Sequence, residues 1–86
     1  MSKIIFQNRR EIHEWLWHKF QYLLDEHKRA AVEEAIAGLL DNGEVTRDEV
    51  DYTLVRELRV LRDRHQITAF EYEKIIAALR ARETET

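Results

Sequence analysis

The first helical segment carries the side chains best suited to metal chemistry, His13, Glu14 and His18. His13 and His18 are five positions apart, so on a helix they point in different directions and do not form the i, i+4 pair of a zinc helix. Glu14 and His18 have that spacing, but no third ligand can be identified for them. We therefore predict no metal site and no cofactor.

The segment around Gly43, Val45 and Glu49 shares letters with a calcium-binding loop: a glycine, a central hydrophobic residue and a final glutamate. In that register the first and third ligand positions are Gly38 and Leu40, which have no side-chain oxygen. Calcium takes roughly six to eight oxygen ligands, so we predict no calcium site. The chain also lacks a Ser/His/Asp order and a glycine-rich phosphate loop. We predict no catalytic residues and no enzyme activity.

Arg56, Arg59 and Arg62 recur every three residues and form a ridge that could reach phosphates. Glu57 and Asp63 interrupt it, and alternating charges are typical of a solvated helix face. The net charge of −3 also lacks the basic excess of most nucleic-acid-binding proteins. A nucleic-acid-binding regulator that uses this ridge is therefore the alternative function.

Aromatic residues are the stronger signal. Trp15 and Trp17 flank Leu16, about 100° to either side on a helix, and one narrow apolar face can hardly bury both. Exposed aromatics beside a core stripe are typical interface anchors. Phe70 attracts attention because it lies off the apolar stripe of the last segment. The predicted partner-binding residues are Trp15, Trp17 and Tyr22, with Arg59 and Phe70 as secondary candidates.

Composition predicts a single helical domain over residues 1–86. Apolar residues make up 44% of the chain, enough for a core, and there are no prolines and only two glycines to interrupt helices. Without cysteine, disulfides and thiolate metal sites are excluded. Mixed charges and the lack of an apolar run of about 20 residues favour a soluble, cytoplasmic protein that does not enter a membrane.

The predicted fold is all-α, a compact bundle of four short helices near 9–26, 29–41, 47–64 and 69–82. Asn8, Thr46 and Thr68 each precede a glutamate by three positions, the form of a capping box. The polar segment 25–29 contains neither Gly nor Pro, so one long helix over 9–41 is the alternative to the first two. The tail 83–86 is expected to fray.

Residues 1–7 form a short N-terminal arm. Ile4, Ile5 and Phe6 could be a strand, but no second strand candidate stands elsewhere in the chain. We expect a hydrophobic arm that folds back on the helices. The alternative is an edge strand offered to a partner.

A helical phrase occurs twice, at 39–50 and 61–72. Each copy ends one helix, turns, places a β-branched residue before a threonine, and puts a glutamate three positions after it. His65 stands in the second copy where Gly43 stands in the first, and histidine enters the left-handed region more readily than most residues. Both turns are therefore expected to form.

These phrases resemble the SHOCT-type short helical module. Leu61-Arg62-Asp63, Ile67-Thr68 and Glu71-Tyr72 carry the resemblance, with Leu79 as the distal apolar position. Leu39-Leu40-Asp41-Asn42-Gly43, Val45-Thr46 and Glu49-Val50 carry a second match. The resemblance implies oligomerisation or protein contact, and it supplies no catalytic residue. We expect a small non-enzymatic protein-interaction module, bacterial or phage-encoded, that acts as an adaptor, regulator or inhibitor, with another protein or as a homodimer.

Overall fold

The computed structural model describes residues 3–40 and 43–82. The predicted tail 83–86, the first two positions of the predicted arm and the predicted end of the second helix at 41 lie outside the described residues. The elements in chain order are β1 (Ile4–Phe6), α1 (Arg9–Lys19), α2 (Glu26–Ala37), β2 (Val45–Thr46), the π-helical turn η2 (Glu49–Leu54), α3 (Val55–Asp63) and α4 (Ala69–Ala81). The chain is mostly helical, as predicted, but not purely so.

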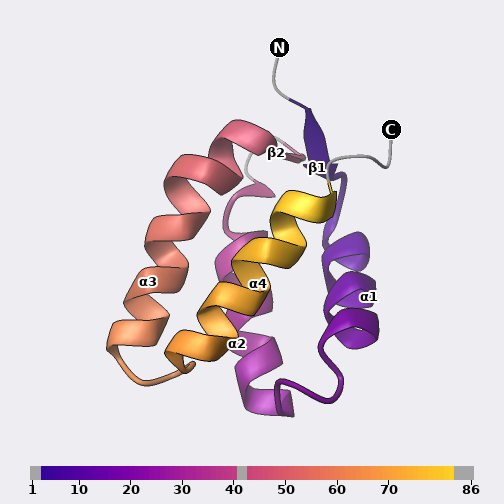
Figure 1. The fold of residues 1–86 in the computed structure, drawn as a ribbon. Coiled ribbons are helices and arrows are strands. Elements are labelled where there is room, and N and C mark those ends of the chain that lie inside the picture. The colour runs from indigo at the N-terminus through magenta and orange to yellow at the C-terminus, as the bar shows by residue number, and fades with distance from the viewer. Residues whose placement is uncertain (1–2, 41–42, 83–86) are drawn as a thin grey trace.

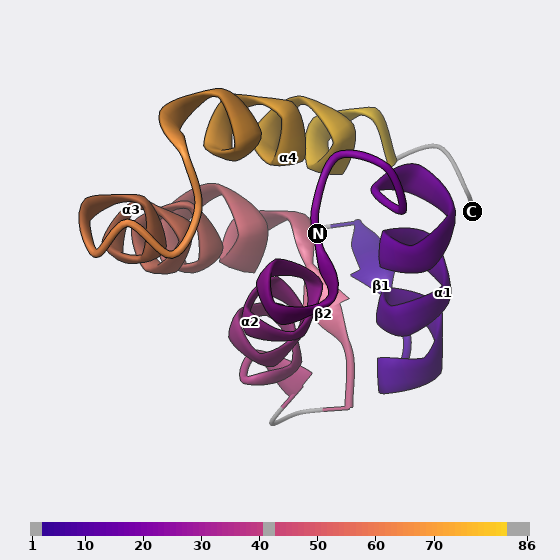
Figure 2. The same ribbon diagram turned by 90° about the horizontal axis from the view of Figure 1, so that it is seen from below.

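The described helices enclose one core. Figures 1 and 2 show α1 and α3 on opposite sides of the molecule, with α2 and α4 between them on the two remaining faces. Every element contributes buried apolar side chains to this core, among them Phe6, Ile12, Leu16, Leu24, Ile36, Val45, Leu54, Leu58, Ile67, Ile75 and Leu79. The core therefore draws on both strands and on all the described helices.

Two helices, not one long helix, occupy the first half of the chain, but the break comes earlier than predicted. α1 ends at Lys19 and α2 begins at Glu26. Asp25 caps α2, because its Oδ1 accepts from the backbone N–H of Lys28 at 2.8 Å. The Arg29 guanidinium donates to the carbonyl oxygens of residues 21 and 24, at 3.1 and 2.9 Å, and so satisfies two loop acceptors.

The N-terminal arm is a strand with a partner inside the chain, which corrects the all-α prediction. β1 pairs antiparallel with β2, with Ile4 opposite Thr46 and Phe6 opposite Val45. Ile5 and Phe6 are buried, so the arm does fold back on the helices. The partner strand was missed because two residues are too few to show a strand period.

The third helical segment contains an irregularity. It begins after Thr46, whose backbone N–H donates to Glu49 Oε1 at 2.9 Å, as the predicted capping box requires. The backbone N–H of Val55 then bonds to the carbonyl oxygen of Val50, the i→i+5 step of a π-helical turn. The predicted helix 47–64 is thus present, as η2 followed by α3.

α4 has a complete capping box at Thr68 and Glu71. Glu71 is the one buried charged residue of the described chain, at 7% exposure. Its Oε1 accepts from the Thr68 N–H at 2.8 Å, and its Oε2 lies 3.1 Å from Lys28 Nζ at the start of α2. The cap therefore also joins α4 to α2.

The turns within the repeated phrases both use the left-handed region, with φ of 87° at Gly43 and 63° at His65. A residue with a Cβ destabilises the folded chain by about 1–2 kcal/mol in this region, and glycine does not. Part of this advantage of glycine is lost because its unfolded chain has more conformational entropy. We expect His65→Gly to raise the free energy of unfolding by about 0.5–1 kcal/mol and Gly43→Ala to lower it by a similar amount. Urea denaturation followed by circular dichroism measures both, and shifts of the same sign would contradict this account.

Candidate interaction surfaces

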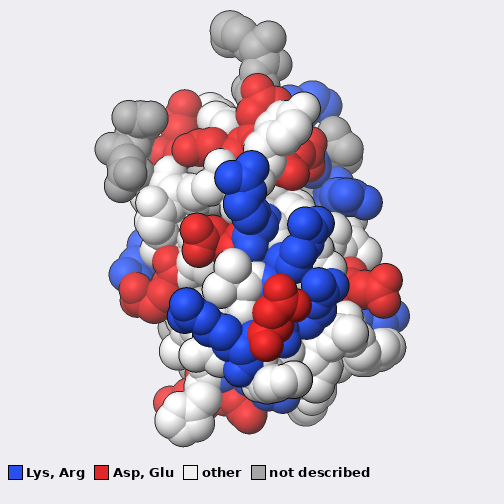
Figure 3. All heavy atoms as spheres, turned by 90° about the vertical axis from the view of Figure 1, so that its left-hand side faces the viewer, with Lys and Arg blue, Asp and Glu red and all other residues white. Residues whose placement is uncertain are grey.

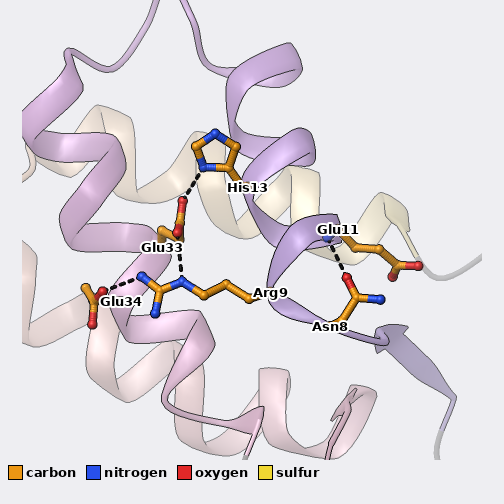
Figure 4. Close-up of polar contacts among 6 residues, drawn as sticks. All are labelled: Asn8, Arg9, Glu11, His13, Glu33 and Glu34. Atoms are coloured by element: carbon orange, nitrogen blue, oxygen red, sulfur yellow. Dashed lines mark hydrogen bonds and ion pairs between the residues drawn. The ribbon is translucent and has the colours of Figure 1, made fainter.

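A charged cluster joins α1 to α2 (Figure 4). Arg9 Nε donates to Glu33 Oε2 at 3.0 Å, and its guanidinium also bonds to Glu34. His13 Nδ1 lies 2.8 Å from Glu33 Oε1. One carboxylate of α2 therefore holds two basic side chains of α1, which fixes how the two helices face each other.

The contacts in this cluster favour the ionised forms of Glu33 and Arg9. Burial opposes ionisation of Glu33, whose side chain is 15% exposed, but hydrogen bonds from His13 and Arg9 outweigh it and hold the pKa of Glu33 below its ordinary value. Hydrogen bonds to Glu34 and Glu33 raise the pKa of Arg9. The charged forms of Glu33 and Arg9 therefore stabilise the contact between α1 and α2.

Trp17 lines a surface hollow of about 240 Å³ beside this cluster. The Arg29 guanidinium lies 4.1 Å from the centre of the Trp17 ring, and the His13 ring lies 5.5 Å from it. Trp17 nevertheless remains 41% exposed. Its indole is half covered by neighbours and half open to solvent, which suits an interface anchor.

Trp15 lies in the core. It is 7% exposed and packs edge-on against Phe6 at 5.5 Å and Phe20 at 5.3 Å between ring centres. The expectation that one helix face cannot bury both tryptophans is confirmed, since Trp17 is the exposed one. We leave Trp15 out of the proposed contact surface because its ring is occupied by the fold.

The other predicted contact residues are exposed on separate elements. Tyr22, in the loop between α1 and α2, is 94% exposed. Phe70, in the first turn of α4, is 59% exposed, with Lys74 Nζ 5.3 Å from its ring centre. Arg59 is exposed on α3, on the opposite side of the molecule from α1. The structure therefore does not bring the five predicted residues into one site.

The outward face of the third helical segment carries two exposed apolar side chains that the sequence analysis missed. Tyr52 in η2 is 72% exposed and Val60 in α3 is 39% exposed, whereas Leu54 and Leu58 are buried on the inner face. Tyr52 and Val60 stand about two turns apart with Arg56 and Arg59 between them. The helical spacing of Tyr52, Arg56 and Val60 in the sequence was the signal that could have identified this face.

The predicted arginine ridge is shorter than expected. Arg62 turns toward α4, where its guanidinium lies 4.9 Å from the centre of the Tyr72 ring, and it also bonds to Asp63. Its side chain is only 34% exposed. Of the three ridge residues, only Arg56 and Arg59 point away from the fold without such contacts among the described residues.

Within 3–40 and 43–82, the structure brings together no set of three His, Asp or Glu side chains able to hold a metal ion. None of the described helices has both the length and the apolar character needed to cross a membrane. Comparison of the chain with family models, with curated proteins and with solved structures gives no match.

Proposed function

We propose that this chain is a small non-enzymatic protein-interaction module that acts in the cytoplasm as an adaptor, regulator or inhibitor. One observation carries the proposal. Large apolar side chains stay exposed although the core is filled: Tyr22, Tyr52, Phe70, Trp17 and Val60. Isolated exposed apolar residues are ordinary, but aromatic residues and arginine are the types that interfaces favour. The resemblance to SHOCT-type modules points the same way, since it implies oligomerisation or protein contact.

Affinity capture from a nuclease-treated lysate of the source cell, read by mass spectrometry, tests this proposal together with sedimentation equilibrium of the pure chain. We expect a protein partner or a homodimer that the variant Trp17→Ser/Tyr22→Ser/Phe70→Ser loses. The matched control His18→Ser/Gln21→Ser/Glu73→Ser changes exposed polar neighbours and should keep it. Retention of the same complex by the aromatic variant would contradict the role of these side chains.

A nucleic-acid-binding regulator is the second candidate, and the exposed arginines of α3 are what favours it. The two readings respond differently to salt. Phosphate contacts weaken steeply as salt rises, whereas an aromatic interface changes little. Complexes that survive about 0.5 M NaCl and nuclease support the protein partner. Complexes that disappear under both treatments support nucleic acid and contradict the protein-interaction proposal.

A further inference from the structure

The outward face of η2 and α3 is an unpartnered helix surface of mixed chemistry. Tyr52, Arg56, Arg59 and Val60 are all exposed there. Figure 3, which views the molecule from the side on which α3 lies in Figure 1, shows several Lys and Arg side chains close together, with acidic and uncharged side chains among them. We call these four residues the α3 face.

Among the described residues, Arg56 and Arg59 have no carboxylate partner. Arg9, Arg10, Arg47 and Arg82 each pair with a glutamate or aspartate of the same chain. No ion pair or hydrogen bond joins Arg56 or Arg59 to any residue within the described ranges. Their guanidinium groups are therefore free to bind carboxylates from outside, a geometry that arginine forms with two parallel hydrogen bonds.

The spacing of the α3 face matches a helix. Tyr52 and Val60 are eight residues apart, or about 12 Å along the axis at 1.5 Å per residue. A partner helix with apolar residues about two turns apart and Asp or Glu between them would cover both apolar side chains and reach both arginines. Amphipathic partner helices present apolar anchors at i, i+3, i+4 and i+7.

Two other occupants fit this face less well. A second copy would make an isologous contact, in which residues near the two-fold axis meet their own copies, so Arg56 and Arg59 would approach like charges. A nucleic acid would gain few phosphate contacts here and would face a chain of net charge −3. Arg62 is bound to Tyr72 and Asp63, and Arg64 lies beyond this face at the end of α3.

We propose that the α3 face docks an acidic amphipathic helix of a partner protein. This inference rests on the proposed function and adds a second contact surface, apart from Trp17, Tyr22 and Phe70, and the chemistry of the helix that it binds. It places the contact on residues that the aromatic variant of the previous section leaves intact.

The test uses the full chain and a synthetic helical peptide whose one face carries leucines two turns apart with glutamates between them. Isothermal titration and ¹⁵N–¹H spectra follow binding. We expect shifts concentrated at Tyr52, Arg56, Arg59 and Val60. The variant Arg56→Glu/Arg59→Glu should weaken binding about 10-fold or more. The control Lys19→Glu/Arg80→Glu, which changes the net charge equally, should leave binding unchanged.

Three results would overturn the inference: equal affinity of the charge-reversal variant and its control, equal binding of a peptide with glutamine at every glutamate, or no binding at about 1 mM peptide. Tighter binding of a DNA duplex than of the peptide at the same salt would also overturn it, in favour of nucleic acid. If Arg56→Glu/Arg59→Glu still captures the cellular partner and the aromatic variant does not, only this inference fails. If the cellular complex disappears on nuclease treatment, the proposed function fails.

Discussion

Replacing Trp15 with alanine is expected to lower the free energy of unfolding by about 3–5 kcal/mol. The indole is 7% exposed and packs edge-on against both Phe6 and Phe20, so its removal leaves a cavity between β1, α1 and the following loop. Edge-on aromatic pairs add about 0.5–1.5 kcal/mol beyond the area that they bury. A domain of this size has a total stability of only about 4–13 kcal/mol. Trp15→Ala should therefore remove a large part of it.

Trp17→Ala is the matched comparison two residues along the same helix. Trp17 is 41% exposed and contributes mainly its contact with the Arg29 guanidinium, so we expect a loss of about 1 kcal/mol or less. Urea denaturation followed by circular dichroism measures both variants. Should Trp15→Ala not fold at all, Trp15→Phe keeps an aromatic ring and should lose about half as much. Equal losses for the two alanine variants would show that the burial assigned to Trp15 is wrong.

The second large effect is expected at Glu71. Glu71→Ala removes the acceptor for the Thr68 N–H and the carboxylate beside Lys28, and we expect it to lower the free energy of unfolding by about 2–3 kcal/mol. The Lys28 side chain is 30% exposed, so solvent screens part of the ion pair. Glu73→Ala, an exposed position on the same helix, should change stability by less than about 0.5 kcal/mol.

Glu71 also makes stability depend on pH. Burial opposes its ionisation, but hydrogen bonds from Thr68 and Lys28 and the Lys28 charge outweigh it, so the pKa of Glu71 in the folded chain lies below its ordinary value of 4.5. A lowered folded pKa stabilises the protein above the unfolded pKa, and this stabilisation is lost as pH falls through the folded pKa. We expect stability to fall with pH below this ordinary value and to fall less steeply in Glu71→Gln.

Urea titrations at several pH values separate these contributions. Glu33 has a lowered pKa for a similar reason, so acid sensitivity should persist in Glu71→Gln and decrease further when Glu33→Gln is added. An unchanged slope in the double variant would show that neither carboxylate carries the pH dependence. The slope of stability against pH should differ between each single variant and the unaltered chain only below the unfolded pKa, because above it each carboxylate is ionised in both states.

Local chemistry explains why much of the fold could be predicted. Asn8, Thr46 and Thr68 accept or donate cap hydrogen bonds within three residues of themselves, so their role is visible in the sequence. His65 takes the left-handed conformation because the turn of the repeated phrase needs it there. Asp25 was a possible cap in the sequence too, but it lies in a polar segment in which several residues could begin the next helix.

Contacts between distant residues decided the rest. The pairing of β1 with β2 joins segments about forty positions apart, and neither strand is long enough to show its own period. Arg62 was indistinguishable from Arg56 and Arg59 until the packing of α4 brought the Tyr72 ring beneath it. The helical period places Trp15 and Trp17 symmetrically about Leu16. Trp15 is the buried one because Phe6 of β1 packs against its ring.

The sequence by itself determined that the chain is mostly helical, where three of its helix caps lie, and that it has more aromatic residues than one narrow helix face can bury. Each of these follows from neighbours within a turn or two of the chain. Only the tertiary structure decided which aromatic and basic side chains stay exposed, because burial depends on what other elements cover. That selection removed Trp15 and Arg62 from the candidate surfaces, left the predicted Trp17, Tyr22, Arg59 and Phe70 exposed, and added Tyr52 and Val60.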